Sequence, residues 1–428
     1  MRLILINLLS IILVTTCVPV TQDSGYQSVN RTVVYDNLTY VPHIRTAMLT
    51  PGASYKTPRQ PSVVQLGKTS NLLLEFDAVE KEFVQYNVKI IHCNYDWKPS
   101  NLQEIQYLNS YNEFQISDYQ FSFNALTEYI HYTFRLPQVK MSGNYLLVVF
   151  RENNENDIML TRRFMVYEPK ASINYEVSTP MGSRQRRDDH QINFDVAYGG
   201  VEVMNPMNEI KILLRQNYRW DNAITDIQPT MVREDQGLLM YESFSDKNIF
   251  TASNEFRFFD ISSLQYLGPS VGEIEKGTQR FKALLDFDGN RSGMGFSVLN
   301  DINGQYYIYN RDMDDGEISG DYVDVYFFLK VDKIPQDVYV IGDAFDWKLN
   351  NETRMEYNEE YESYILKKTL KQGYYNYMYL IPEATNPYKL EGNYTETENI
   401  YEIFAYFRGG ADIADRLIGY TRFVHNER

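Results

Sequence analysis

The chain has 428 residues, more than one ordinary hydrophobic core organises, and a typical size of about 150 residues per domain predicts three domains. Its formal net charge of −16 would repel a nucleic-acid backbone, so we expect no nucleic-acid partner. The composition includes 36 Tyr and 23 Phe, residue types that favour strands, and therefore predicts a β-rich protein.

The first residues are typical of an export signal. Residues 1–17 read MRLILINLLSIILVTTC and place Arg2 before an apolar stretch that is too short to cross a bilayer. Cys17 stands where a bacterial lipoprotein carries its acylated cysteine, although Thr16 replaces the Gly, Ala or Ser that usually precedes it. Lipidation of Cys17 and simple cleavage nearby both remain open. A single acyl chain would attach the protein to a membrane only weakly without further contacts.

Cys93 is the only thiol that follows this signal, so the exported chain cannot form an internal disulfide. Its stability must then come from hydrophobic cores. The surrounding sequence, VKIIHCNYDW, predicts that Cys93 is a small buried residue and not a reactive one.

Strand-length apolar runs begin after a polar lead and predict a first β-sandwich domain over residues 32–168. Turn-forming Gly, Pro, Asn and Asp separate these runs, which lie at 71–79, 86–96, 129–137, 143–153 and 160–168. Pro169 cannot donate a hydrogen bond to a sheet and is expected to end the domain.

The pattern restarts at Ser172 and predicts a second β-rich domain over 169–332, with long connections around 219–253. Further runs after Pro335 predict a C-terminal β-sandwich domain over 333–428. Gly373 lies between two strands of that domain, where a tight reversal is expected. The predicted fold class is all-β, with immunoglobulin-like antiparallel β-sandwich domains in tandem.

Residues with catalytic or ligand-binding spacing are missing from the sequence. The histidines are far apart and none has a metal-ligand spacing with a second His or Cys; they are His43, His92, His131, His190 and His425. Neither a nucleophile elbow nor a phosphate-binding loop is present. We therefore predict no catalytic, metal-binding or cofactor-binding residues, no cofactor, no small-molecule substrate and no enzyme activity.

Three tryptophans share one sequence context. Trp97 in YDWKPS, Trp220 in YRWDNA and Trp347 in FDWKLN each come just after a predicted strand and beside an aspartate. A sugar-binding surface needs such rings together on one face, whereas these fall one in each predicted domain. Packing at the corner of each domain is the simpler interpretation, and the three rings are retained as candidate loop aromatics.

Seven segments, in order and with similar spacing, resemble the plug protein of the type IX secretion system of Bacteroidetes. They are NYDWKPSNL (94–102), ISDYQFSFNA (116–125), SGNYLLVVF (142–150), LTRRFMVYE (160–168), NPMNEIKILLRQNYRWDNA (205–223), NEFRFFDISSLQY (254–266) and EGNYTETENIYEIFAYFRG (391–409). The likeness extends from about residue 32 to about residue 421.

This resemblance implies a non-enzymatic, periplasmic protein that binds the large outer-membrane translocon barrel and seals its inner mouth when no substrate is in transit. It provides no catalytic or ligand-binding residues to carry over. A lipid at Cys17 is not essential to that role, so the chain either diffuses in the periplasm or stays peripherally attached to the outer membrane.

The last predicted domain resembles another group. VYVIGDAFDW (338–347) and the following ESYILKKTLKQGYYNYMYLI are similar to early-set, immunoglobulin-type glycogen- and starch-binding modules, in which a tryptophan of that turn stacks on glucose. The lysine expected in such a site is replaced within YNYMYLI, which indicates a shared fold more than a shared ligand. The alternative function is therefore a periplasmic or surface carbohydrate-binding protein that acts through Trp347.

Overall fold

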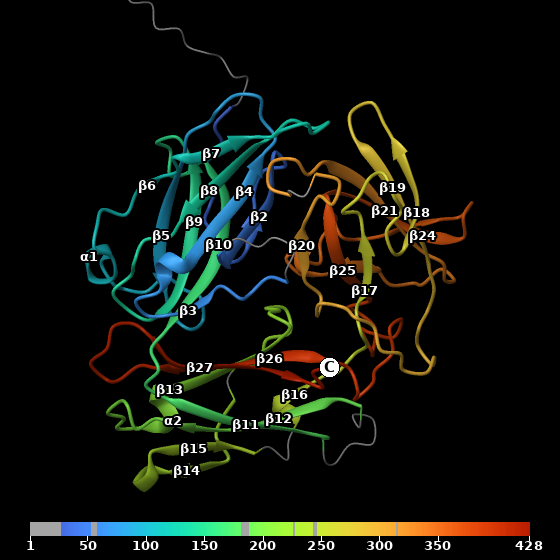
Figure 1. The fold of residues 1–428 in the computed structure, drawn as a ribbon. Helices are drawn as coiled ribbons and strands as arrows, with labels where there is room; N and C mark the ends of the chain where they lie inside the picture. Colours follow the sequence, from blue (N-terminus) through green and yellow to red (C-terminus); the bar gives the residue numbers. More distant parts are fainter. Residues whose placement is uncertain (1–26, 53–57, 181–187, 226, 243–245, 314–315) are drawn as a thin grey trace, which may run out of the picture.

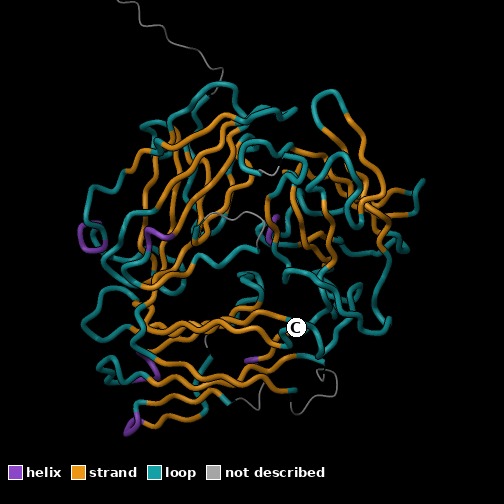
Figure 2. Tube along the Cα trace, viewed as in Figure 1, coloured by secondary structure: helices purple, strands orange, loops and turns teal. Residues whose placement is uncertain are grey.

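The computed structural model describes residues 27–52, 58–180, 188–225, 227–242, 246–313 and 316–428. Strands hold 43% of the chain and helices 5%, which confirms the predicted all-β class (Figure 2). The predicted signal segment, 1–17, and Cys17 within it lie outside the described residues. In the part of the chain that is described, no helix has the length and apolar character needed to span a membrane.

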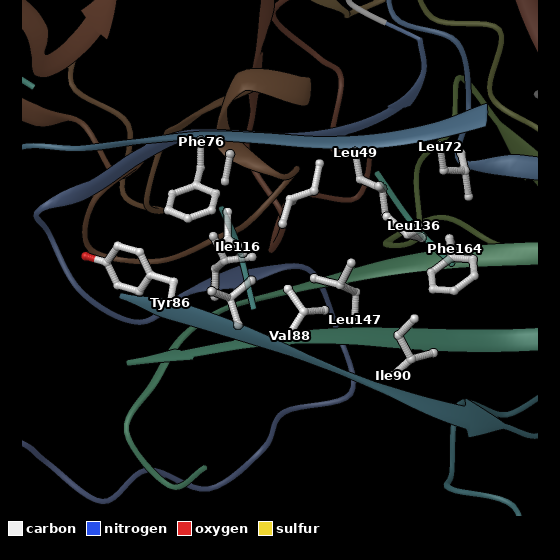
Figure 3. Packing of buried hydrophobic residues seen from close by; sticks show 14 of the residues in the cluster. Leu49, Leu72, Phe76, Tyr86, Val88, Ile90, Ile116, Leu136, Leu147 and Phe164 are labelled. Carbon is white, nitrogen blue, oxygen red and sulfur yellow. The ribbon is translucent and has the colours of Figure 1, made fainter. Parts of the chain in front are cut away.

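The first domain is a sandwich of two sheets that enclose a large core (Figures 1 and 3). One sheet has the order β1 (Leu38–Thr39), β10 (Ile158–Tyr167), β9 (Gly143–Arg151), β5 (Tyr86–Cys93), β6 (Phe114–Gln115), with β3 (Val63–Gln65) beside β10. The other has the order β2 (Ile44–Pro51), β4 (Leu72–Ala78), β8 (Ile130–Arg135), β7 (Asp118–Phe121). The short helices η1 (Thr69–Asn71) and α1 (Glu104–Tyr107) lie in its connections.

Strand β4 shows why the sandwich is covered on two sides. Its sequence, LLLEFDA, is buried at every position. Because side chains alternate along a strand, Leu72, Leu74 and Phe76 point into the first core, as Figure 3 shows for Leu72 and Phe76. Glu75 and Asp77 occupy the opposite face, which packs against the third domain.

The second domain is built from two separate parts of the chain. One sheet has the order β11 (Ser172–Ser178), β12 (His190–Ala197), β15 (Leu238–Tyr241), β14 (Met231–Arg233), with β16 (Ile249–Phe250) beside β12. The facing sheet joins β13 (Ile210–Gln216) to two strands from the end of the chain, β26 (Asn399–Phe407) and β27 (Arg416–His425). Helices α2 (Pro206–Glu209), η3 (Glu234–Gln236) and η4 (Asp246–Asn248) lie in its loops.

The third domain is consequently an insertion between β16 and β26 (Figure 1). One sheet has the order β17 (Arg257–Asp260), β25 (Gly373–Leu380), β20 (Tyr306–Ile308), with β22 (Tyr339–Ile341) also on β25. The other has the order β18 (Val271–Lys276), β19 (Phe281–Asp288), β21 (Tyr322–Leu329), β24 (Ser363–Lys371), β23 (Glu356–Asn358). Helix η5 (Asp343–Phe345) follows β22.

Three features of this pairing differ from the sequence analysis. The division expected between residues 332 and 333 does not coincide with the sheets, because β21 and β24 pair within one sheet while β26 and β27 return to β13. The β3–β10 and β19–β21 pairs are parallel within otherwise antiparallel sheets. Gly373 makes no hairpin, since β24 and β25 belong to opposite sheets; a side chain there would meet the Tyr307 carbonyl oxygen at 2.3 Å.

The first and second domains share an apolar interface. The outer face of the β10–β9–β5 sheet packs on the outer face of the β13–β26–β27 sheet, and Leu146, Met165, Leu213 and Phe404 are buried between them. Cys93 is buried in the same cluster, where burial raises the pKa of its thiol to about 12. This agrees with the small buried residue predicted from its sequence context.

Candidate functional site at the junction of the three domains

Two of the predicted tryptophans meet where the first and second domains join. Trp97 follows β5 and Trp220 follows β13, and their rings contact edge to face, with centroids 5.1 Å apart and planes at 88°. The guanidinium of Arg163, on β10, lies over both rings, 4.3 Å from the Trp97 centroid and 4.9 Å from the Trp220 centroid. A cation between two aromatic faces is attracted by both, so Arg163 joins the two corners.

Arg215, on β13, completes the second-domain side of this contact. Its guanidinium lies 4.5 Å from the Trp220 centroid and binds the Glu402 carboxylate through two hydrogen bonds of 2.6 and 2.9 Å. Both charged groups are almost completely buried. Two parallel hydrogen bonds fix the guanidinium plane, and that plane in turn orients the Trp220 ring.

The third tryptophan lies in a closed environment in the inserted domain. Trp347 is 6% exposed, and the guanidinium of Arg219 from the second domain lies 4.7 Å from its ring centroid. Phe256 contacts the ring edge to face at 5.9 Å, and Gly304 packs against its far edge. Since Arg219 covers the ring face, the stacking surface that a sugar would need is already occupied. The geometry therefore argues against carbohydrate binding through Trp347.

A cavity of about 430 Å³ lies between these groups, and both Trp220 and Trp347 line it. Each charged side chain of its lining has an ion-pair partner, within the lining or next to it. Asp36 contacts both Arg163, at 3.3 Å, and Lys348. Asp343 accepts a hydrogen bond of 2.8 Å from Arg59 of the first domain. The cavity is thus bordered by ion pairs that link domains, and its charges already have protein partners.

A buried polar cluster joins the first and third domains. Asp77, on β4, accepts hydrogen bonds of 2.7 Å from Lys371 Nζ and 2.7 Å from the Tyr322 hydroxyl, and contacts His131 Nδ1 at 2.8 Å. Lys371 and Asp77 are each about 1% exposed. Burial alone would raise the pKa of Asp77, but Lys371 and His131 hold it below its ordinary value. The carboxylate therefore binds both domains together as an anion.

His131 is a cation in this cluster at neutral pH. Burial opposes its protonation, but the carboxylates of Asp77 and Glu75 outweigh that effect and raise its pKa to about 9. Glu75 lies 3.7 Å from His131 Nε2. Two carboxylates are thus balanced by an imidazolium and the ammonium of Lys371.

This balance predicts a loss of stability at alkaline pH. Because the pKa of His131 is higher in the folded chain than in the unfolded one, its protonation stabilises the fold. This stabilisation is fully present below the unfolded-state pKa of 6.5 and is lost as the pH rises through the folded-state pKa of about 9. Between pH 7 and pH 10 the natural chain is expected to lose about 2–3 kcal/mol more free energy of unfolding than His131→Gln loses. Urea unfolding at the two pH values measures this. Equal losses in the two proteins would contradict it.

Some residues of this site were predicted from the sequence, and others were not. The structure brings Trp97 and Trp220 into contact and places Trp347 in the lining of the cavity that Trp220 also lines. The arginines at 163, 215 and 219, which hold the rings, were missed. Their signal was a charge inside an apolar strand or directly after one, as in LTRRFMVYE and RQNYRW.

Within the described ranges, no group of three or more His, Cys, Asp or Glu side chains is arranged to hold a metal ion.

Comparison with known proteins agrees with the architecture. None of the curated proteins matches the chain. A crystal structure of a hypothetical protein from Parabacteroides merdae ATCC 43184 is similar over 92% of this chain and all of its own length, with 29% sequence identity and a TM-score of 0.85. Residues 44–168, which form most of the first sandwich, match the family model for the type 9 secretion system plug protein 1st domain. This match assigns the first sandwich to that domain type and supports a relation of the chain to the type 9 (type IX) secretion system plug family.

Proposed function

We propose that the protein is a non-enzymatic plug that binds and seals the periplasmic mouth of the type IX translocon barrel when no substrate is in transit. The main support for this proposal is that side-chain contacts at the junction hold the three domains together as one rigid unit. A pore wide enough for folded cargo would leak small molecules, and only a stiff protein that fills its mouth would block their diffusion. The family match to the first domain supports a role in this secretion system.

Two properties make the body stiff. The third domain leaves and re-enters the second, so it is attached by two chain segments and not by one linker. Contacts between side chains of different domains are buried and charged, as in the Lys371–Asp77 pair. Breaking such a contact leaves an uncompensated charge in the interior, which makes independent domain movement costly.

A non-enzymatic role fits the chemistry of the junction. Its carboxylates and guanidinium groups are committed to ion pairs, as in Arg59–Asp343 and Arg219–Asp221, at 2.8 and 2.6 Å. A catalytic pair needs groups that a substrate can reach and whose charge is free to change. Side chains that neutralise one another hold an interface together instead.

The proposed location is the periplasm, reached through the signal at residues 1–17. Peripheral attachment to the outer membrane would follow if Cys17 carried a lipid, with the barrel providing the second contact that one acyl chain requires. Mass spectrometry of the mature amino terminus distinguishes an acylated Cys17 from simple cleavage.

Removal of the protein is expected to make the outer membrane leak. Cells that lack it should take up a small dye or an antibiotic faster than the parent strain, because the unoccupied barrel then has an open inner mouth. Expression of the natural chain should restore the barrier, and the tagged protein should copurify with a large barrel from detergent-solubilised outer membrane. Deletion cells that stay as impermeable as the parent, with the barrel present and empty, would contradict the proposal.

A further inference from the structure

An aromatic surface lies along the free edge of the first domain. Tyr119 and Phe121 on β7 are both exposed, and Phe123 follows them. Phe83, from the β4–β5 connection, packs on Tyr119 with ring centroids 4.5 Å apart. Together with Leu126 these residues form what we call the β7 surface. Contiguous exposed aromatics of this kind mark interaction sites, in contrast to single exposed apolar residues.

The alternation of β7 explains the position of these rings. Tyr119 pairs with Tyr132 and Phe121 with Ile130 on β8, and both partners belong to the first core. The two exposed aromatics therefore point to the core side of the sheet but lie beyond its covered area. They extend the buried apolar layer outward to the solvent.

Strand β7 lacks the devices that protect other edges of this molecule. At the opposite edge of the same sheet, β2 has an irregular register and ends in Pro51. The edge strand β18 carries an irregularity as well as Glu273 and Glu275. Within the described residues no strand pairs with the outer edge of β7. Charges, bulges and proline normally prevent pairing at an edge, and β7 has only Asp118 at its start.

The third domain holds the β7 surface in place. The backbone N–H of Phe123 donates a 2.7 Å hydrogen bond to the Ile318 carbonyl, and that of Leu126 donates to the Asp321 carboxylate at 2.5 Å. The Tyr129 hydroxyl donates to the Gly320 carbonyl at 3.0 Å. A surface that is already ordered loses little conformational entropy when a partner binds.

The charge around this surface favours a basic partner. Exposed Glu82, Asp118 and Glu128 lie in the segments that form it, against one exposed lysine, Lys81. The net charge of the whole chain, −16, has the same negative sign. Opposite charge on a partner would speed encounter and fix its register.

We propose that an extended segment at the periplasmic rim of the barrel adds to the outer edge of β7 as a further strand. This segment places apolar side chains against Tyr119, Phe121 and Phe123 and lysine or arginine side chains near the surrounding carboxylates. Free backbone groups of β7 provide the ladder, and the aromatic rings provide specificity. The inference rests on the proposed plug function and adds to it the surface by which the plug docks.

Photocrosslinking of the full-length protein in cells tests this contact. A photoreactive phenylalanine analogue replaces Phe121, and in a second protein it replaces Tyr361, which is 56% exposed on the third domain. Crosslinking to the barrel is expected from position 121 and not from position 361. Phe121→Ala/Phe123→Ala should reduce the captured barrel at least about tenfold, because aromatic anchors carry much of the binding energy at such interfaces. Tyr361→Ala should leave capture unchanged.

Charge reversal provides a separate test. Asp118→Lys/Glu128→Lys should lower capture, and added salt should no longer weaken the capture that remains, since attraction to basic side chains is replaced by repulsion that salt screens. Failure of the natural chain to capture any barrel would overturn the plug function and this inference with it. Capture by the natural chain with crosslinks from position 361 only, or capture unchanged in the Phe121→Ala/Phe123→Ala protein, would overturn the docking surface alone.

Discussion

Asp77→Asn is expected to lower the free energy of unfolding by about 3–5 kcal/mol, because it removes a fully buried carboxylate that binds the first domain to the third. The amide has the same shape but no charge, so the buried Lys371 ammonium and His131 imidazolium lose their shared partner. The Tyr322 hydroxyl also loses a charge-assisted hydrogen bond. Urea unfolding followed by tryptophan fluorescence measures the loss. A three-domain chain can unfold in steps, and the first transition is expected to shift most.

Glu359→Gln is the matched control for this variant. Glu359 pairs with Lys333 at 2.6 Å, but both side chains are largely exposed. Solvent and salt screen such a pair, so its loss should cost far less than the loss of the buried Asp77 carboxylate. Similar costs for the two variants would show that the Asp77 cluster does not bind the first domain to the third.

Gly304→Ala is expected to cost about 2–4 kcal/mol, from backbone conformation and from overpacking together. Gly304 has φ of +80°, which disfavours any residue with a side chain. An added Cβ would also lie 2.3 Å from Trp347 and 2.7 Å from Phe256. Trp347 would have to shift, which alters its contact with Arg219, so the fluorescence of the folded variant should change along with its stability.

Gly293→Ala separates the two contributions. Gly293 has φ of +79°, almost the same as Gly304, but no atom lies within 4 Å of the position that its Cβ would take. Its replacement should cost only about 1 kcal/mol, from the conformation alone. If Gly304→Ala costs no more than this control, the packing around Trp347 is loose and the junction is not the rigid contact described above.

The strands were predictable because their pattern is local. NLLLEFDAV alternates side chains that face the core with side chains that face a neighbour, and β4 follows that alternation. The two carboxylates in this run were visible in the sequence as charges inside an apolar strand. Their cationic partner was not, since Lys371 lies almost 300 residues further along the chain.

The pairing of strands and the contacts between domains were not predictable in the same way. The run that forms β26 has the same character whether it joins the third domain or returns to β13, so the sequence does not distinguish the two partners. Each tryptophan was correctly placed after a strand, but the meeting of Trp97 with Trp220 depends on how two domains dock. Docking is determined by the outer faces of sheets, where short-range patterns carry little information.

The return of β26 to β13 also has a consequence for biogenesis. About 190 residues separate Leu213 from its partner Phe404, so an emerging nascent chain exposes the apolar edge of β13 until synthesis is nearly finished. Chaperones must protect this intermediate throughout that interval. A product that terminates early can never close its second domain, and proteases would recognise it by that open edge.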